Sequence, residues 1–273
     1  MFLPDRRRIL VPPSASALRF IDPDGISTED SRPAPNKAHE FFLKASIASS
    51  SSPGSAYIEH GQQKILAFVE GPRPIRSSFS NKARFEVDVR FLPVSSDLHT
   101  LGIQRGQGFY SALERNISEY VYTSIVPSIR LDQYPKSLIS LSIVILSNHT
   151  SKADQTKQIA ASCVTTASIA LVDSGIQLMD IVTACAVKFT INPIKVELDL
   201  DDDETNIGKG VVSLMISRDE ITGFWIDNDS QQSLDDVYLL ESLFETAQNG
   251  AKELRKLINS VLLDSVPNSD SQI

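Results

Sequence analysis

The stretch from Ile159 to Val172 contains no charged residue, only Ala, Val, Ile, Leu, Cys and small hydroxyl side chains. A helix that is apolar or small around its whole circumference has no face for water, so other elements must cover it on every side. Asp173-Ser174-Gly175 follows, and Gly175 can adopt the left-handed backbone conformation that ends a helix. We therefore predict that this stretch is the central helix of the fold.

Segments on both sides of this stretch have the β-branched, aromatic and alternating residues that are typical of strands. The predicted strands are 41–47, 56–60, 64–69, 83–91, 138–146, 181–189, 211–216 and 221–226, the last two as a hairpin. Amphipathic helices are predicted at 111–125 and at 237–261. The pattern indicates an α/β (α+β) fold with a long C-terminal helix.

Two connecting segments are also predicted. Gly71–Arg76 (GPRPIR) is expected to form a stiff turn that ends a strand, and Ser147–Lys157 a polar loop that leads into the central helix.

The composition is that of an ordinary soluble domain, with 41% hydrophobic and 22% charged residues in a chain of 273. Residues 1–39 are rich in Pro, Ser, Asp and Arg, which predicts an extended N-terminal arm before a domain at 40–264 and a flexible tail at 265–273. Cys163 and Cys185 lie in apolar surroundings, as buried thiols of a reducing compartment do. No apolar run reaches the roughly 20 residues that cross a bilayer, so we expect no membrane partner.

Charge is distributed unevenly along the chain. From Lys64 to Lys136 ten Lys and Arg stand against seven Asp and Glu, whereas from Glu197 to the end five stand against seventeen. The total of −8 argues against a surface that coats nucleic acid as a whole. The asymmetry still permits a local basic path for a polyanion.

The known motifs of metal, nucleotide and hydrolase sites are absent from the sequence. The four histidines, His39, His60, His99 and His149, have no cysteine or second histidine at ligand spacing, and no Walker, G-x-G-x-x-G or G-x-S-x-G motif occurs in the expected context. The acidic run Glu197–Glu204 could hold Mg²⁺ or supply a general acid and base. The alternative, a solvated acidic loop, is the commoner outcome for such runs. We therefore expect no metal and no cofactor.

Several motifs, taken together and in order, resemble the RNase PH family. They are Gly54-Ser55-Ala56, Gly71-Pro72-Arg73-Pro74-Ile75-Arg76, Leu113-Glu114-Arg115, Tyr134-Pro135-Lys136-Ser137-Leu138-Ile139 and Ala167–Ile176. The resemblance covers residues 40–262, and Asp5–Arg8 with Gly223-Phe224-Trp225 are most similar to a fungal ring subunit of the eukaryotic RNA exosome. It implies an RNase PH-like fold, with mixed β-sheets and helices in two βαβ-like halves.

The family reaction is phosphorolysis of the last phosphodiester at an RNA 3′ end, and three of its requirements are missing at the matching positions. The phosphate cradle of active relatives corresponds to Ser147–Lys157, which has no glycine and no arginine. Gly108 and Phe109 stand where those relatives have an arginine pair, and Glu204 and Gly210 where they have two acidic residues. The resemblance thus implies a non-catalytic subunit. The alternatives are an active phosphate-dependent 3′→5′ exoribonuclease or an unrelated α/β protein.

The resemblance also implies partners. They are other RNase PH-like subunits in a heterodimer within a six-subunit ring, cap subunits with S1 and KH domains, RNA, and a hydrolytic nuclease associated with the complex. The processes would be rRNA processing and decay of mRNA and non-coding RNA, in the nucleus, nucleolus and cytoplasm.

Four arginines are candidates for RNA contact because Arg can make bidentate bonds to phosphate oxygens. They are Arg73, Arg76, Arg84 and Arg105. The alternative is that they form surface or subunit-interface ion pairs.

Overall fold

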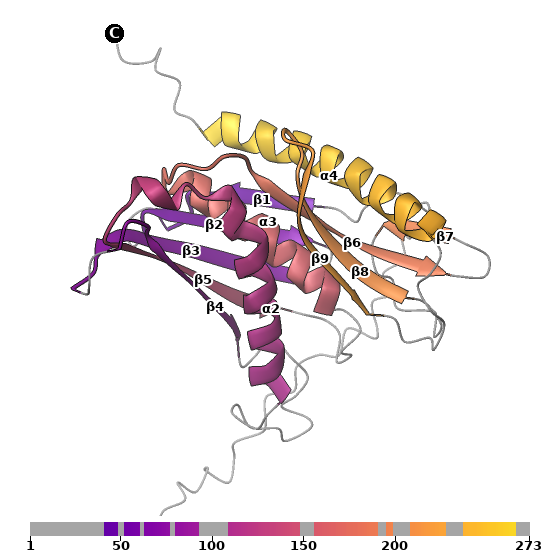
Figure 1. The fold of residues 1–273 in the computed structure, drawn as a ribbon, viewed down its shortest axis with the longest axis horizontal. Helices are drawn as coiled ribbons and strands as arrows, with labels where there is room; N and C mark the ends of the chain where they lie inside the picture. The colour runs from indigo at the N-terminus through magenta and orange to yellow at the C-terminus, as the bar shows by residue number, and fades with distance from the viewer. Residues whose placement is uncertain are drawn as a thin grey trace, which may run out of the picture. The chain divides into compact units, whose positions relative to one another are not determined.

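The computed structural model describes residues 41–48, 52–60, 63–76, 80–92, 109–147, 156–190, 195–198, 208–227 and 237–265 (Figure 1). All of them belong to the compact unit Ala34–Ile273. The predicted arm at 1–39 lies outside the described residues, as does the chain after Ser265. Arg105, Gly108 and Glu204 also lie outside them.

The first half of the chain forms a five-stranded sheet in the order β1-β2-β3-β5-β4. Its strands are β1 (Phe41–Ala45), β2 (Gly54–His60), β3 (Gln63–Pro74), β4 (Arg84–Phe91) and β5 (Ser137–Ser147). All neighbours pair antiparallel except β4 and β5, which are parallel and are joined through the helix α2 (Phe109–Ile125) and two short 3₁₀ turns, Val126–Ser128 and Leu131–Gln133. A parallel pair needs such a crossover, so β4, α2 and β5 form a βαβ unit.

The second half forms a four-stranded sheet in the order β7-β6-β8-β9, whose described pairs are all antiparallel. Its strands are β6 (Val182–Thr190), β7 (Lys195–Leu198), β8 (Gly208–Met215) and β9 (Glu220–Asp227). The predicted hairpin is therefore confirmed as β8 and β9. The long helix α4 (Val237–Ser265) packs on this sheet, where Leu243, Ala247 and Ala251 share a core cluster with residues of β6 and β8.

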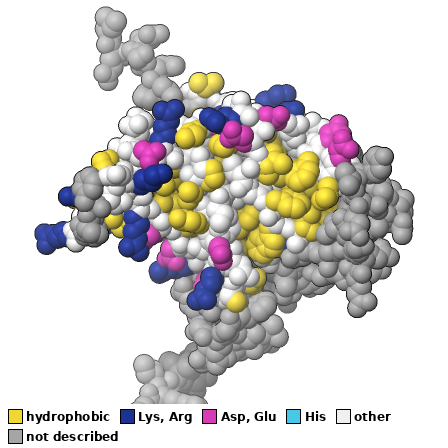
Figure 2. All heavy atoms as spheres, viewed as in Figure 1, with side chains coloured by type: hydrophobic (Ala, Val, Ile, Leu, Met, Phe, Trp, Pro, Cys, Tyr) yellow, Lys and Arg dark blue, Asp and Glu magenta, His cyan; other side chains and the backbone are white. Residues whose placement is uncertain are grey.

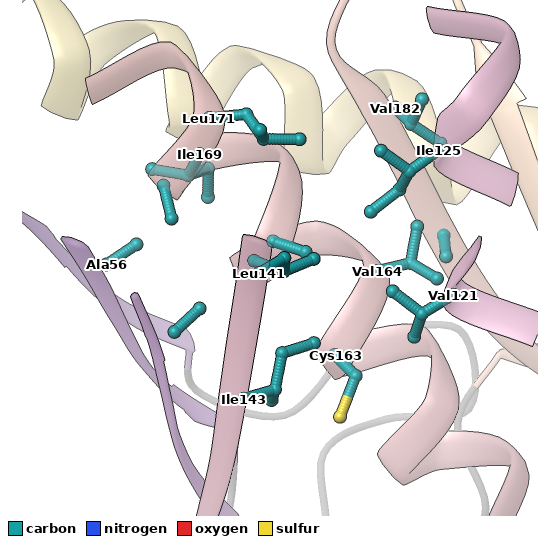
Figure 3. Close-up of a cluster of buried hydrophobic side chains, with 14 of the residues drawn as sticks. Ala56, Val121, Ile125, Leu141, Ile143, Cys163, Val164, Ile169, Leu171 and Val182 are labelled. Atoms are coloured by element: carbon teal, nitrogen blue, oxygen red, sulfur yellow. The ribbon is translucent and has the colours of Figure 1, made fainter. Parts of the chain in front are cut away.

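The central helix α3 (Thr156–Asp173) lies between the two sheets and contacts β2 and β3 on one side and β6 and β8 on the other (Figure 1). Every residue from Lys157 to Leu171 is buried, which the uncharged stretch predicts from Ile159 onward. Figure 3 shows Cys163 and Val164 of α3 among side chains of β5 and α2.

The close approach to α3 depends on small residues. A side-chain carbon added to Gly54 would lie 2.3 Å from the carbonyl oxygen of Ala170, so β2 touches the helix backbone directly. Gly175 has φ of +73° and ends the helix as predicted.

Two sequence-based predictions of segment boundaries are wrong. β3 does not end at Gly71 but continues through Pro74, with a bulge between Glu70 and Arg73, because β5 supplies pairing partners on the far side of the Gly71-Pro72 step. The second error concerns the polar loop. α3 already begins at Thr156, so Lys157 is a buried helix residue.

A buried ion pair holds α4 to the segment that leaves α3. The Asp180 carboxylate lies 2.6 Å from Nη2 of Arg255 and accepts hydrogen bonds from the backbone N–H of Ser217 and of Ile181, at 2.9 and 2.8 Å. Burial alone would raise the pKa of Asp180, but these backbone donors and the Arg255 guanidinium outweigh it and hold the pKa below its ordinary value.

Among the described residues, no helix is both long and apolar enough to span a membrane.

The substitution Asp180→Asn removes the charge that faces Arg255 and leaves the guanidinium without its counter-ion, so we expect a loss of about 3 kcal/mol in the free energy of unfolding at pH 7. Because the pKa of Asp180 is lower in the folded than in the unfolded chain, its stabilising effect is present above about pH 4 and declines as the pH falls further. Urea unfolding at several pH values measures both effects. A variant as stable as the wild type at pH 7 contradicts this account.

Candidate nucleic-acid interface

Basic residues gather at one end of the first sheet, where three chain segments meet. The backbone N–H of Ile75 donates to the carbonyl of Lys136 at 3.0 Å, and the N–H of Lys136 donates to the carbonyl of Ser80 at 3.2 Å. The N–H of Ala83 donates to the carbonyl of Leu131 at 3.0 Å. We call the exposed cations on these segments the basic end: Arg73, Arg76, Lys82, Arg84, Arg130 and Lys136.

Arg73 and Arg84 lie on either side of the same residue of β5. Arg73 on β3 and Arg84 on β4 are both in register with Leu138, and β5 runs between the two strands. Because directly opposed residues point to the same face and strands are about 4.8 Å apart, the two side chains project from one face with roughly 10 Å between their Cα atoms. Ile139, the residue after Leu138 on β5, is fully buried and faces α3. Because adjacent strand residues point to opposite faces, Leu138 and the two arginines face away from α3.

Both arginines have carboxylate partners on their own strands. Arg73 lies 2.8 Å from Glu70 and Arg84 lies 2.7 Å from Glu86, and the side chains of both arginines are largely exposed. Exposed ion pairs of this kind contribute little to stability, so either arginine can exchange its carboxylate for a phosphate at small cost. Both arginines thus form the surface ion pairs that the alternative predicts. These ion pairs do not prevent the same arginines from contacting a polyanion.

The structure thus brings together Arg73, Arg76 and Arg84, while Arg105 lies outside the described residues. Sequence reasoning missed Lys82, Arg130 and Lys136. Lys136 belongs to the motif Tyr134–Ile139, which pairs with residues of Gly71–Arg76 in the sheet. Recognising that the two motifs pair could have placed Lys136 at the basic end. Lys82 also has a surface partner, Asp132 at 3.4 Å.

The first turn of α3 is the region where the family resemblance expects a phosphate cradle, and here it holds a buried lysine. Lys157 is 2% exposed, and its Nζ lies 3.0 Å from the centre of the Trp225 ring on β9. Lys188 and Lys209 are opposed on β6 and β8. Alternation along these strands turns them to the same face as Ala186 and Val211, the face that packs on α3. The described residues near this helix end therefore present three cations.

Gly210 lies in β8 and faces the other way. A side-chain carbon there would lie 3.0 Å from Cγ1 of Ile226 and 3.7 Å from Cγ2 of Val187, both of which pack with α4. A carboxylate at this position would enter the apolar cluster under α4 and point away from α3. Within the described residues, no three His, Cys, Asp or Glu side chains come together as possible metal ligands.

A second exposed surface is apolar and lies at the edge strand β9. Ile221 is 51% exposed and Phe224 is 43% exposed, and the Phe224 ring lies 5.2 Å from the Phe244 ring of α4. Figure 2 shows hydrophobic side chains gathered over β9 and the adjoining part of α4. We call Ile221, Phe224 and Phe244 the β9 surface. Sequence reasoning did not predict it, since a hairpin strand of alternating residues does not reveal which face stays uncovered.

Residues 37–177, more than half of the chain, match the model of the RNase PH family, described as "3′ exoribonuclease family, domain 1". The chain belongs to this family. The RNase PH-like fold that the sequence predicts is therefore confirmed, and the family model covers the first sheet, α2 and α3.

Similar proteins are exosome components. The chain is 28% identical to "Exosome complex component mtr3" of Schizosaccharomyces pombe over 264 residues, 95% of this chain and 96% of that protein. It is 29% identical to "Exosome complex component Rrp41" of Cenarchaeum symbiosum over 175 residues, 64% of this chain and 68% of that protein. The crystal structure of rice (Oryza sativa) Rrp46 superposes with a TM-score of 0.64 at 16% identity, covering 85% of this chain and 98% of that one, which is a likeness of fold.

Proposed function

We propose that this protein is a non-catalytic ring subunit of the eukaryotic RNA exosome. The observation that carries the proposal is the match to mtr3 of Schizosaccharomyces pombe, which runs over nearly the whole of both chains. A match of that extent includes the second sheet and α4, which lie outside the part matched by the family model. The proposed role is to build the ring and to guide RNA, in rRNA processing and in decay of mRNA and non-coding RNA.

The absence of catalysis is supported by the residues at the first turn of α3. Phosphorolysis needs an anion cradle and a group that transfers a proton or holds a metal. The stretch before α3 has no glycine and no arginine, and Gly210 can supply no side-chain group. The three lysines near this helix end, Lys157, Lys188 and Lys209, cannot replace a pair of carboxylates.

We expect the purified protein, alone and with its co-expressed heterodimer partner, to release no nucleoside diphosphate from RNA in the presence of inorganic phosphate. Chromatography of the products measures this, with a phosphorolytic member of the same family as the positive control. Diphosphate release above the protein-free background would establish the rival function, a phosphate-dependent 3′→5′ exoribonuclease.

A ring subunit must contact two neighbours through two different surfaces. The β9 surface suits one of these contacts because it joins exposed apolar side chains to the unpaired edge of a sheet. The other described edge strands are β1, β4 and β7. Of these, β4 carries Arg84, Glu86, Asp88 and Arg90 on its outer face, a pattern that discourages strand addition.

We expect Ile221→Glu and Phe224→Ser, each alone, to reduce co-purification of the other ring subunits by roughly tenfold or more, because burying such a side chain contributes about 1.5–3 kcal/mol. Leu257→Glu is the matched control, since Leu257 is 49% exposed on α4. Thermal unfolding of each purified variant separates lost assembly from lost folding. Normal assembly of both β9 variants would place the ring contacts elsewhere.

The basic end is the proposed part of the RNA path, through Arg73, Arg76 and Arg84. Arg105 joins them in the proposal on the grounds of sequence alone. The path is supported by the arrangement of Arg73 and Arg84 on one face of the sheet, with Arg76 two residues beyond β3.

In a reconstituted ring, the double change Arg73→Glu and Arg76→Glu should weaken binding of single-stranded RNA. The slope of log affinity against log salt should fall by about 1.4, since each phosphate contact on a single strand contributes about 0.7. Lys252→Glu with Lys256→Glu on the exposed face of α4 is the matched control. An unchanged slope in the arginine variant removes both residues from the path.

The remaining partners and the locations are proposed from the relationship to exosome components. They are RNase PH-like neighbours, S1/KH cap subunits and an associated hydrolytic nuclease. The protein would act in the nucleus, the nucleolus and the cytoplasm, with no cofactor of its own.

A further inference from the structure

An exposed tyrosine on α2 is stacked on an aromatic ring of the sheet below it. Tyr122 is 42% exposed, and its ring lies 5.9 Å from the Phe85 ring with an angle of 22° between the two planes. Phe85 itself is 6% exposed and belongs to the main core. One face of the Tyr122 ring therefore packs on the buried Phe85 ring, while the tyrosine remains exposed to solvent.

The stack lies at the basic end, because α2 runs antiparallel to β4. The backbone N–H of Phe91 donates to Glu114 at 2.9 Å, and Oγ of Ser118, one turn later, donates to the carbonyl of Val87 at 2.8 Å. Tyr122 follows one turn further on and meets Phe85, at the start of β4.

At that start of β4, Arg84 precedes Phe85 in the chain. Ala83 is hydrogen-bonded to Leu131, which brings Lys82 and Arg130 to the same corner. The aromatic stack thus shares this corner of the sheet with Lys82 and Arg130, whereas Arg73 and Arg84 project from the opposite face of the sheet.

We propose that Tyr122 is a stacking platform for an RNA base at the basic end. This inference rests on the proposed function, since it adds a base contact to the phosphate contacts proposed for the same end of the sheet. Proteins that bind single-stranded RNA commonly use this combination, because the bases stack on aromatic rings while Arg and Lys hold the phosphates. The contact would be insensitive to sequence, since every base has a π-face.

The other exposed aromatic side chains of the described residues lie in different settings. Phe42 meets Tyr57 edge to face on β1 and β2, and Phe224 is tilted against Phe244 beside α4. Neither is next to the basic end, and neither is held in a parallel stack. Tyr122 therefore has both features that a base platform needs.

One acidic residue near Tyr122 should weaken RNA binding there, and it provides a second test of the proposal. Glu119 is exposed on the turn of α2 before Tyr122, so it would repel the phosphates that flank a stacked base. If RNA lies on Tyr122, Glu119→Gln should tighten binding severalfold.

The main experiment measures single-stranded RNA affinity and its salt dependence in reconstituted rings that carry Tyr122→Phe, Tyr122→Leu or Tyr122→Ala. We expect Tyr122→Phe to bind within about twofold of the wild type, because the ring is kept. Tyr122→Ala and Tyr122→Leu should each lose about tenfold, since one base stack is lost in both. The salt slope should stay unchanged, because no phosphate contact is removed.

Each result separates the possibilities. If Tyr122→Leu binds as the wild type does, apolar packing on Phe85 accounts for Tyr122 and the platform is refuted. If the arginine variant weakens binding and Tyr122→Ala does not, the platform fails while the RNA path stands. If neither weakens binding, the path and the platform both fail. If Tyr122→Ala loses ring subunits, Tyr122 is a protein contact and the proposal is overturned.

Discussion

The burial of α3 on all sides is the constraint on which the rest of the fold depends. A helix without a polar face is stable only where two layers enclose it, so the first sheet covers one side and the second sheet the other. The second sheet then has an apolar face of its own to cover, and α4 packs on it through Leu243, Ala247 and Ala251. The small residues of α3 allow these close contacts, and Gly54 shows how little space remains between β2 and the helix.

This layered order leaves the outer face of the first sheet without a covering helix among the described residues. β4 carries charged side chains of both signs on that face, whereas the edge strand β9 of the second sheet carries exposed apolar side chains. The contacts proposed with other molecules therefore lie at sheet ends and edges. The basic end suits a polyanion and the β9 surface suits a protein neighbour, so one chain can separate its two kinds of partner in space.

The sequence predicted what depends on local pattern and missed what depends on pairing over long distances. Both amphipathic helices and the hairpin follow from periodicity within a window of residues, and the central helix follows from its uncharged stretch. That Arg73 and Arg84 flank Leu138 depends on β3 and β4 both pairing with β5, which no local pattern specifies. The polar composition of the segment that ends at Lys157 predicts a loop, whereas Lys157 is buried in α3. Its burial depends on the ring of Trp225, which is distant in the chain.

β9 connects the first turn of α3 with the surface proposed for assembly. Adjacent residues of a strand point to opposite faces, so Trp225 turns toward Lys157 and Tyr120 while Phe224 turns toward Phe244 and solvent. The Tyr120 hydroxyl, 2.7 Å from Oγ of Ser213, fixes the inner side of this arrangement. A lysine at the first turn is opposed by the helix dipole, and the face of the Trp225 ring offsets that cost. Trp225 thereby anchors β9 to the first turn of α3, and the position of the β9 surface depends on that anchor.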